Sequence, residues 1–309
     1  MSLARPTPLQ ILLLTALLCL IWGSTWVVIQ KGLVDMPPFG SVALRFTLAA
    51  TIMSALAARF ARSEGGLRPS LALSLMLGGL NFGVSFGLVY WTETKLPSGL
   101  VSVLWAVFPM AQAIVGHLFL PGERIGPAQG FGFALGFLGV VALFATDLRE
   151  LGPGAVPAGA LYLLSPLASA IGTTYVKKHG AGTSSLQLNR NAMWLATAIL
   201  WTLALVFERD AHFGWSAQAV ASIVYLALFG SVTAFGLYFW LLRHVPANRM
   251  SVIAYVTPAI ALGLGALFGD EHVGAWTLAG LAAILTGVFL VHRGGLPRKP
   301  QVARAPASS

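Results

Sequence analysis

Apolar residues fill this chain in long runs, and short polar or Gly/Pro-containing segments separate one run from the next. Ten runs are long enough for a helix to cross a hydrocarbon core of ~30 Å at ~1.5 Å per residue. Their expected bounds are Leu9–Val34, Pro38–Arg59, Pro69–Thr92, Leu96–Leu120, Pro127–Thr146, Ala158–Lys178, Ser185–Phe207, Ser216–Arg243, Ala247–Gly269 and Gly274–His292. The pattern predicts an all-α integral membrane protein with ten transmembrane helices.

Composition supports a membrane protein and excludes a soluble one of this size. Of the 309 residues, 57% are apolar and 9% charged, whereas about 25% are charged in soluble domains. The first run stays apolar to about Val34, too long for a signal peptide, so we expect a retained helix. The single cysteine, Cys19, excludes an internal disulfide.

The sequence repeats itself at an offset of 149 residues. Leu96–Met110 and Val245–Ala259 share five of fifteen positions, including a proline near the start and a second proline twelve residues later. Ser85–Trp91 (SFGLVYW) matches Ala234–Trp240 (AFGLYFW) at the same offset. Further matches at an offset of 148 are Glu123/Glu271, Gly126/Gly274, Gly132/Gly280 and Gly139/Gly287.

These matches predict two copies of a five-helix unit, residues 1–150 and 151–294, followed by a disordered cytoplasmic tail, residues 295–309. The Gly/Pro-rich Leu151–Pro157 is the expected linker. Because five is odd, the second copy must enter the membrane from the opposite side. Inverted repeats of this kind are typical of secondary transporters, whose substrate sites lie near the midplane between the repeats.

Basic residues concentrate on one side of the predicted topology. Fourteen fall on the side of the amino terminus: Arg5, Arg59, Arg62, Arg68, Arg124, Lys177, Lys178, Arg190, Arg243, Arg249, Arg293, Arg298, Lys299 and Arg304. Four fall on the other side: Lys31, Lys95, Arg149 and Arg209. Since cytoplasmic loops are enriched in Lys and Arg, both termini are expected in the cytoplasm. Glu93 and Glu271 fall outside by this count.

The fourth and ninth runs each carry one polar, small and proline-bearing helical face. In the fourth run Ser98, Ser102, Trp105, Pro109, Gln112 and Gly116 are spaced three or four apart. Proline inside a helix removes a backbone hydrogen bond, so Pro109 and its counterpart Pro258 are candidate hinges, and Ser102, Trp105 and Ser251 are candidate substrate contacts. An ordinary kinked packing helix is the alternative.

Other polar and aromatic residues inside the runs complete the candidate substrate site. Asn81 and Ser85 are expected to share a helical face with Gly78, either lining a cavity or bonding one helix to another. The remaining candidates are Trp22 and Thr25 in the first run, Thr173 in the sixth, Tyr238 in the eighth and Tyr255 in the ninth.

Arg45 is the one charge clearly inside a run. An intramembrane charge suggests function, and its partner could be a substrate carboxylate or Asp35. Extension of its side chain to the outer interface is the alternative.

The sequence offers no catalytic or cofactor chemistry. No Asp or Glu occupies the middle of a run, no nucleotide-binding glycine loop occurs, and no His/Cys/Asp/Glu set has metal-ligand spacing. We therefore expect no enzyme, no cofactor, no metal and no nucleic-acid partner.

Several of these features together resemble the drug/metabolite transporter superfamily and its EamA-type members: ten helices in a five-plus-five duplication, Trp22-Gly-Ser-Thr25, Ala43-Leu-Arg-Phe46, the proline-bearing fourth and ninth helices, and Glu123 and Glu271 after them. The resemblance implies a cavity formed by helices 1, 3, 4, 6, 8 and 9. It is strongest to bacterial inner-membrane exporters of aromatic and other neutral amino acids, acting as a monomer or weak homodimer on a small-molecule substrate.

The expected function is therefore export of such metabolites by alternating access. An exporter of lipophilic drugs or cations is an alternative, which the absence of an intramembrane carboxylate disfavours. An uncoupled facilitator or channel is a further alternative.

Overall fold

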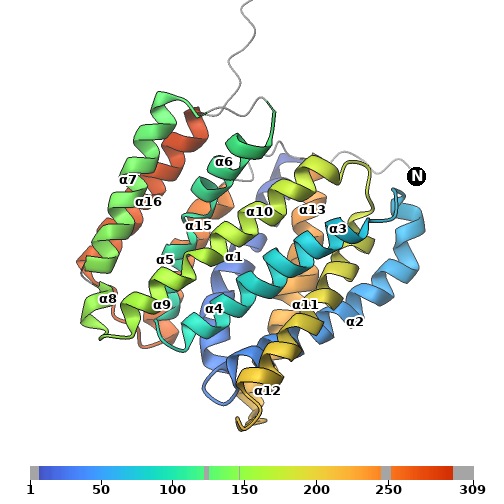
Figure 1. Cartoon of the computed structure of the whole chain (residues 1–309), viewed down its shortest axis with the longest axis horizontal. Helices are drawn as coiled ribbons and strands as arrows, with labels where there is room; N and C mark the ends of the chain where they lie inside the picture. The colour runs from blue at the N-terminus through green and yellow to red at the C-terminus, as the bar shows by residue number, and fades with distance from the viewer. Residues whose placement is uncertain (1–6, 122–124, 146, 245–251, 295–309) are drawn as a thin grey trace, which may run out of the picture.

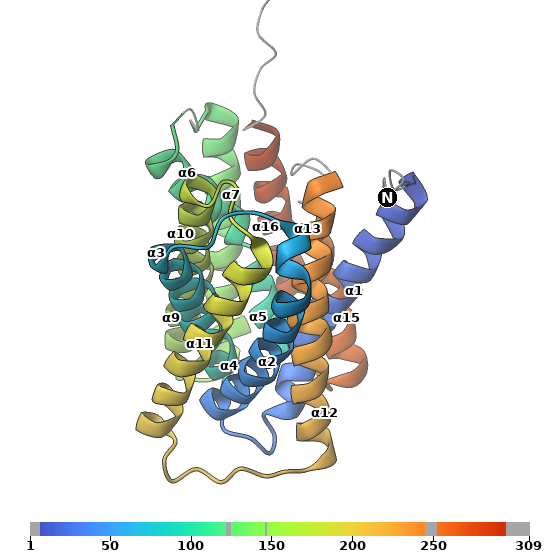
Figure 2. The ribbon, with the colours of Figure 1, turned by 90° about the vertical axis from the view of Figure 1, so that its right-hand side faces the viewer.

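The computed structural model describes residues 7–121, 125–145, 147–244 and 252–294, and these form a bundle of helices (Figures 1 and 2). Within those ranges the secondary structure is helical apart from an isolated β-bridge between Leu67 and Thr183. The expected all-α fold is confirmed.

The helices follow the expected runs closely. In chain order they are α1 (Pro8–Gly32), α2 (Pro38–Glu64), α3 (Leu71–Leu75), η1 (Met76–Val84), α4 (Ser85–Glu93), α5 (Ser98–Trp105), α6 (Phe108–Phe119), α7 (Pro127–Ala145), α8 (Asp147–Glu150), α9 (Ala155–Tyr162), α10 (Leu164–His179), α11 (Ser185–Phe207), α12 (Ala217–Tyr225), η2 (Leu226–Thr233), α13 (Ala234–His244), α15 (Val252–Phe268) and α16 (Ala275–Gly294).

In the part of the chain that the structure describes, seven helical stretches are long and apolar enough to cross a membrane. They are Pro8–Gly32, Pro38–Glu64, Leu71–Glu93, Ser98–Phe119, Ala155–His179, Ser185–Phe207 and Ala217–Tyr238. Three shorter apolar stretches, Gln129–Ala145, Val256–Phe268 and Ala275–Val291, correspond to the fifth, ninth and tenth expected spans. The protein is therefore a multi-pass membrane protein, and a count of ten crossings stays a prediction.

Two of the expected spans contain a π-helix that the apolar pattern did not predict. The third span is α3, η1 and α4 in succession, and the eighth is α12, η2 and α13. The two π-helices end at Val84 and Thr233, 149 residues apart (233 − 84), which is the offset of the sequence repeat. Since a π-helix makes i→i+5 hydrogen bonds, it changes which residues share a face.

The expected common face of Gly78 and Asn81 is wrong for that reason. A Cβ atom at Gly78 would touch Ala192 of α11, whereas the Asn81 side chain bonds Ser169 of α10. The two residues face different neighbours across the π-helical segment.

Two pairs of helices from the two halves lie side by side at opposite edges of the bundle (Figure 1). At one edge α2 packs along α11, and two indole nitrogens of α11 donate to hydroxyls of α2: Trp194 to Ser54 at 2.9 Å and Trp201 to Thr47 at 3.1 Å. At the other edge α7 packs along α16. Between these edges, α1 packs on α15 and α10 on α6 and η1.

Glycines set the close approach of α7 and α16. A Cβ at Gly132 would lie 2.6 Å from the Gly287 carbonyl oxygen, and a Cβ at Gly139 would lie 2.8 Å from the Gly280 carbonyl oxygen. Gly132 thus meets Gly287, the sequence match of Gly139, and Gly139 meets Gly280, the sequence match of Gly132. The two helices therefore run antiparallel. These glycines therefore allow close helix packing, as small residues do between membrane helices.

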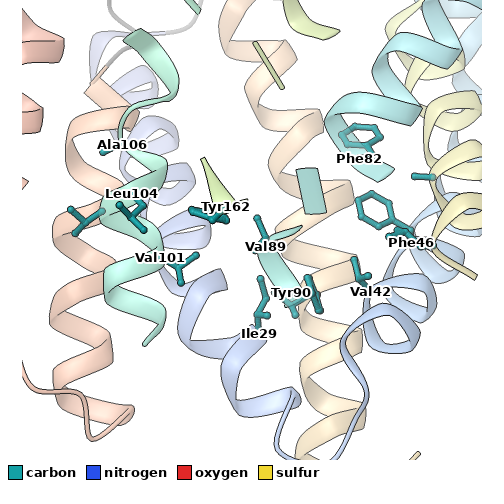
Figure 3. Packing of buried hydrophobic residues seen from close by; sticks show 14 of the residues in the cluster. Ile29, Val42, Phe46, Phe82, Val89, Tyr90, Val101, Leu104, Ala106 and Tyr162 are labelled. Atoms are coloured by element: carbon teal, nitrogen blue, oxygen red, sulfur yellow. The ribbon is translucent and has the colours of Figure 1, made fainter. Parts of the chain in front are cut away.

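Buried apolar side chains fill the space between the two edges. Figure 3 shows Ile29 of α1, Val42 of α2, Tyr90 of α4, Val101 of α5 and Tyr162 of α9 in this cluster. Residues from both halves of the chain thus share one core.

Glutamates cap the starts of helices in the other half of the chain. Glu64, at the end of α2, accepts hydrogen bonds from the Leu186 amide of α11 at 3.2 Å and the Ser184 hydroxyl at 2.6 Å. Glu208, just after α11, accepts from the amides of Phe39 and Gly40 of α2 at 2.8 and 2.7 Å. A carboxylate at a helix start satisfies free amides and complements the helix dipole.

A third cap lies at the start of α5. Glu271 accepts from the Ser98 amide and hydroxyl at 2.7 and 2.6 Å, and from the Gly99 amide at 2.8 Å. This contact explains physically why a glutamate stands between the ninth and tenth spans. Its repeat counterpart, Glu123, lies outside the described residues.

Gly139→Leu should weaken the contact of α7 with α16. A Cβ at this position already meets the Gly280 oxygen at 2.8 Å and the Ala283 Cβ at 3.0 Å, and overpacking typically costs ~1–3 kcal/mol. We expect a lower thermal unfolding midpoint for the detergent-solubilised protein. Gly130→Leu on the same helix is the control, because a Cβ there meets nothing within 4 Å. Equal midpoints for the two variants would contradict the proposed contact.

Candidate functional site

Trp22 of α1 lies against two aromatic residues of α13. Its ring centroid is 5.9 Å from that of Phe235 and 5.5 Å from that of Tyr238. Trp22 and Tyr238, both candidates from the sequence, are therefore brought together. Neither ring is fully buried, so each retains surface that could contact a solute.

Trp26, one turn further along α1, faces the broken fourth span instead. Its ring centroid is 6.2 Å from that of Trp105 of α5, which in turn stacks on Phe108 of α6 at 5.6 Å and 4°. The two tryptophans of α1 thus connect aromatic groups of the fourth and eighth spans. Trp26 was not a sequence candidate, although its spacing of four from Trp22 places both on one helical face.

Asn81 and Ser85 form a polar seam with α10. The Asn81 amide nitrogen donates to the Ser169 carbonyl oxygen at 3.1 Å and to the Thr173 hydroxyl at 2.9 Å. The Ser85 hydroxyl lies 2.8 Å from the Ser165 hydroxyl and accepts from that of Ser169 at 3.1 Å. The candidates Asn81, Ser85 and Thr173 therefore join the third span to the sixth. The Asn81 side-chain oxygen is buried without a hydrogen-bond partner in the described part of the chain.

Arg45 is buried in the bundle, with 1% of its surface exposed. Its Nε donates to the Ser231 hydroxyl at 3.1 Å, and a terminal nitrogen donates to the Tyr90 hydroxyl at 3.3 Å. The guanidinium carbon lies 4.8 Å from the Phe86 ring centroid, a distance at which cation–π attraction contributes.

The structure corrects two expectations for Arg45. Extension of the side chain to the outer interface is wrong, because the residue is buried. Pairing with Asp35 is also wrong, because the Asp35 carboxylate accepts from the Ser216 hydroxyl and Arg45 bonds the hydroxyls of other helices.

Glu93, at the end of α4, is a buried carboxyl that the sequence placed outside. It is 4% exposed, and neither carboxylate oxygen has a hydrogen-bond partner among the described residues. The hydroxyls of Thr92 and Tyr162 are likewise buried and unpartnered there. Arg45 and Glu271 are the charged groups that act on it electrostatically. The Gln30 backbone also acts on the carboxylate, which offsets part of the hydration that a buried carboxylate loses.

In the described part of the chain, the remaining candidates form no hydrogen bond with another helix. The hydroxyls of Thr25 and Ser102 donate to carbonyls of their own helices, at Trp22 and Gly99, at 2.7 and 2.6 Å. Ser251 lies outside the described residues. The backbone of Tyr255 lies in α15, but its side chain is outside the described part.

The two candidate hinge prolines stand in different local structures. The fourth span breaks at Ala106 and Val107, and Pro109 follows in the first turn of α6. Pro258 lies inside α15, which continues past it. Only the first proline coincides with an interrupted helix.

Glu93 was missed because it sits in Trp91-Thr-Glu-Thr-Lys95, a polar stretch that reads as a loop. Its burial comes from packing against α9 and other helices distant in sequence, which periodicity does not reveal. In the described residues, no group of three or more His, Cys, Asp or Glu side chains is arranged to hold a metal ion.

Comparisons with known proteins agree with this architecture. A family model described as "EamA-like transporter family" matches residues 9–145 and 157–293. "Uncharacterized inner membrane transporter YedA" of Escherichia coli (strain K12) is 29% identical over 290 residues, covering 93% of this chain and 92% of the relative. "Probable amino-acid metabolite efflux pump" of the same organism is 26% identical over 289 residues, covering 90% and 93%. A solved crystal structure shares the fold, with a TM-score of 0.66 and 19% identity over 90% of this chain and 96% of that one.

A double-mutant cycle should reveal coupling between Arg45 and Glu93. Arg45→Met leaves Glu93 without its nearby positive charge, so we expect a larger loss of unfolding free energy in the wild type than in a Glu93→Gln background. The interaction energy should lie within about 0.5–3 kcal/mol. Chemical unfolding in detergent micelles measures it. Pairing Arg45→Met with Glu150→Gln, an exposed acid, is the control cycle and should be additive. Additivity of the first cycle would contradict the coupling.

Proposed function

We propose that this chain, which belongs to the EamA-like transporter family, is a secondary transporter that exports small metabolites across the bacterial inner membrane by alternating access. Its substrates would be aromatic and other neutral amino acids. The observation that carries this proposal is the aromatic connection of α1 with the fourth and eighth spans. The amide and hydroxyl groups that join the third and sixth spans supply polar contacts in the same bundle. The efflux pump named above supports the substrate class.

Several features support an inverted five-plus-five arrangement. The family model matches two stretches whose starts and ends are each 148 residues apart (157 − 9 and 293 − 145). The π-helices occur at equivalent positions of the two halves. The helix contacts are also equivalent in the two halves. The first span packs on the ninth (α1 on α15), and the sixth packs on the fourth (α10 on α6).

The proposed substrate contacts are those named from the sequence. They are Trp22, Thr25, Asn81, Ser85, Ser102, Trp105, Thr173, Tyr238, Ser251 and Tyr255. Because the Asn81 nitrogen and Ser85 are engaged by α10, polar contact with a solute would require the third and sixth spans to shift relative to one another. Bending near Pro109 and Pro258 would accompany that shift, with both termini in the cytoplasm.

One observation favours a second candidate, export of lipophilic cations. Sequence reasoning disfavoured it because no carboxylate was expected inside the membrane. Glu93 supplies a buried carboxyl without a hydrogen-bond donor, which could neutralise a cationic solute or carry a coupling proton.

Flux through proteoliposomes tests the amino-acid proposal. We expect uptake of radiolabelled Phe, Thr or Met above that of empty vesicles. Vesicles preloaded with unlabelled Phe should take up label several-fold faster, because a carrier returns more quickly when loaded.

Other outcomes of the same assay identify the alternatives. Uptake without such stimulation would indicate a channel. Uptake of tetraphenylphosphonium with no uptake of any amino acid would overturn the amino-acid proposal in favour of cation export.

Trp105→Ala should weaken transport of an aromatic substrate more than that of a small one. An aromatic pair contributes ~0.5–1.5 kcal/mol beyond its buried area, so KM for Phe should rise about 2- to 12-fold while KM for Thr changes less. Concentration-dependent counterflow measures both constants. Trp215→Ala, at an exposed tryptophan before α12, is the control. Equal losses for Phe and Thr would indicate a packing role for Trp105.

A further inference from the structure

A pocket of about 590 Å³ lies between the end of α2, the start of α3 and the start of α11. None of the proposed substrate contacts lines it. The segment that joins α2 to α3 passes close to the start of α11 (Figure 2), where the Leu67 amide donates to the Gly182 carbonyl oxygen at 2.8 Å. The volume is in the range of small-molecule sites.

Three arginines from three separate segments line this pocket. Arg62 comes from the end of α2, Arg68 precedes α3, and Arg190 comes from the second turn of α11. The Asn191 side-chain oxygen accepts from Arg190 Nε at 3.1 Å and from a terminal nitrogen at 2.8 Å, which orients that guanidinium. In the described part of the chain, no carboxylate forms an ion pair with any of the three.

The enrichment of basic residues on one side of the membrane does not require three arginines to line the same pocket. The positive-inside bias depends on how many basic residues lie near the span ends, not on whether they face one pocket. Arginine side chains that line one pocket and form no ion pair with a carboxylate are available to phosphate oxygens, which guanidinium groups bind in a bidentate way.

The rest of the lining is apolar and belongs to α2. Ala57, Ala58 and Ala61 line the pocket, and their small side chains leave room along that face of the helix. Nearby Leu67 and Leu71 are 69% and 75% exposed, as expected where side chains contact acyl chains. The pocket therefore combines a cationic rim with an apolar wall at the end of two spans.

We propose that this pocket binds the phosphate of an anionic phospholipid, with an acyl chain along the alanine face of α2. Basic pockets between spans at one membrane surface suit lipid headgroups. The terminal segments of the chain do not complement it, because residues 1–6 and 295–309 carry basic and no acidic side chains. The proposal does not depend on which solute the protein transports.

Lipid binding to the purified full chain tests the proposal. Native mass spectrometry would compare dioleoyl phosphatidylglycerol with dioleoyl phosphatidylcholine. We expect the wild type to prefer the anionic lipid. The triple variant Arg62→Gln/Arg68→Gln/Arg190→Gln should lose roughly 100-fold in affinity for it, since each basic residue near a membrane surface contributes a factor of about five.

Arg59→Gln is the matched control, because Arg59 lies on the same helix but does not line the pocket; it should retain wild-type affinity. Thermal unfolding of each variant without added lipid excludes misfolding, and the single variant Arg190→Gln, expected to lose about five-fold, covers a triple variant that fails to fold.

Three results would overturn the proposal: no preference for the anionic lipid, equal loss in Arg59→Gln, or competition by inorganic phosphate at the same concentration as the lipid. The last would assign the pocket to a free phosphate instead.

Discussion

Hydrocarbon offers no water to a buried polar group, so each polar side chain inside the bundle needs a partner on its own backbone or on another helix. Arg45 meets this requirement with two hydroxyls from other spans and the face of Phe86. Ser85 and the amide nitrogen of Asn81 meet it through α10. The buried polar residues therefore mark the places where helices bond to one another. A solute that bound to these residues would have to replace those hydrogen bonds.

Among the buried polar groups without a hydrogen-bond partner in the described residues, Glu93 is the carboxyl, and this makes it informative. Its carboxyl oxygens are buried without donors, while one guanidinium and one further carboxylate act on it from nearby. A group in this position has a different energy with and without a bound proton or cation. Binding of a proton or cation at Glu93 could therefore be coupled to a change of conformation.

Most of the fold could be predicted from the sequence, because the runs of apolar residues and the paired glycines depend on local pattern. The sequence proposed four residues of the candidate site that the structure brings into contact: Trp22 lies against Tyr238, and Asn81 bonds Thr173. The π-helices could not be predicted, since the same apolar sequence suits an α-helix. Glu93 was misplaced because its burial depends on helices far away in the chain.

The glutamate caps of α2 and α11 are reciprocal: the end of each helix carries the acid that completes the start of the other. A self-complementary contact of this kind is what a two-fold symmetric dimer requires. Because α2 and α11 belong to one chain, this reciprocal contact is intramolecular and does not depend on protein concentration in the membrane.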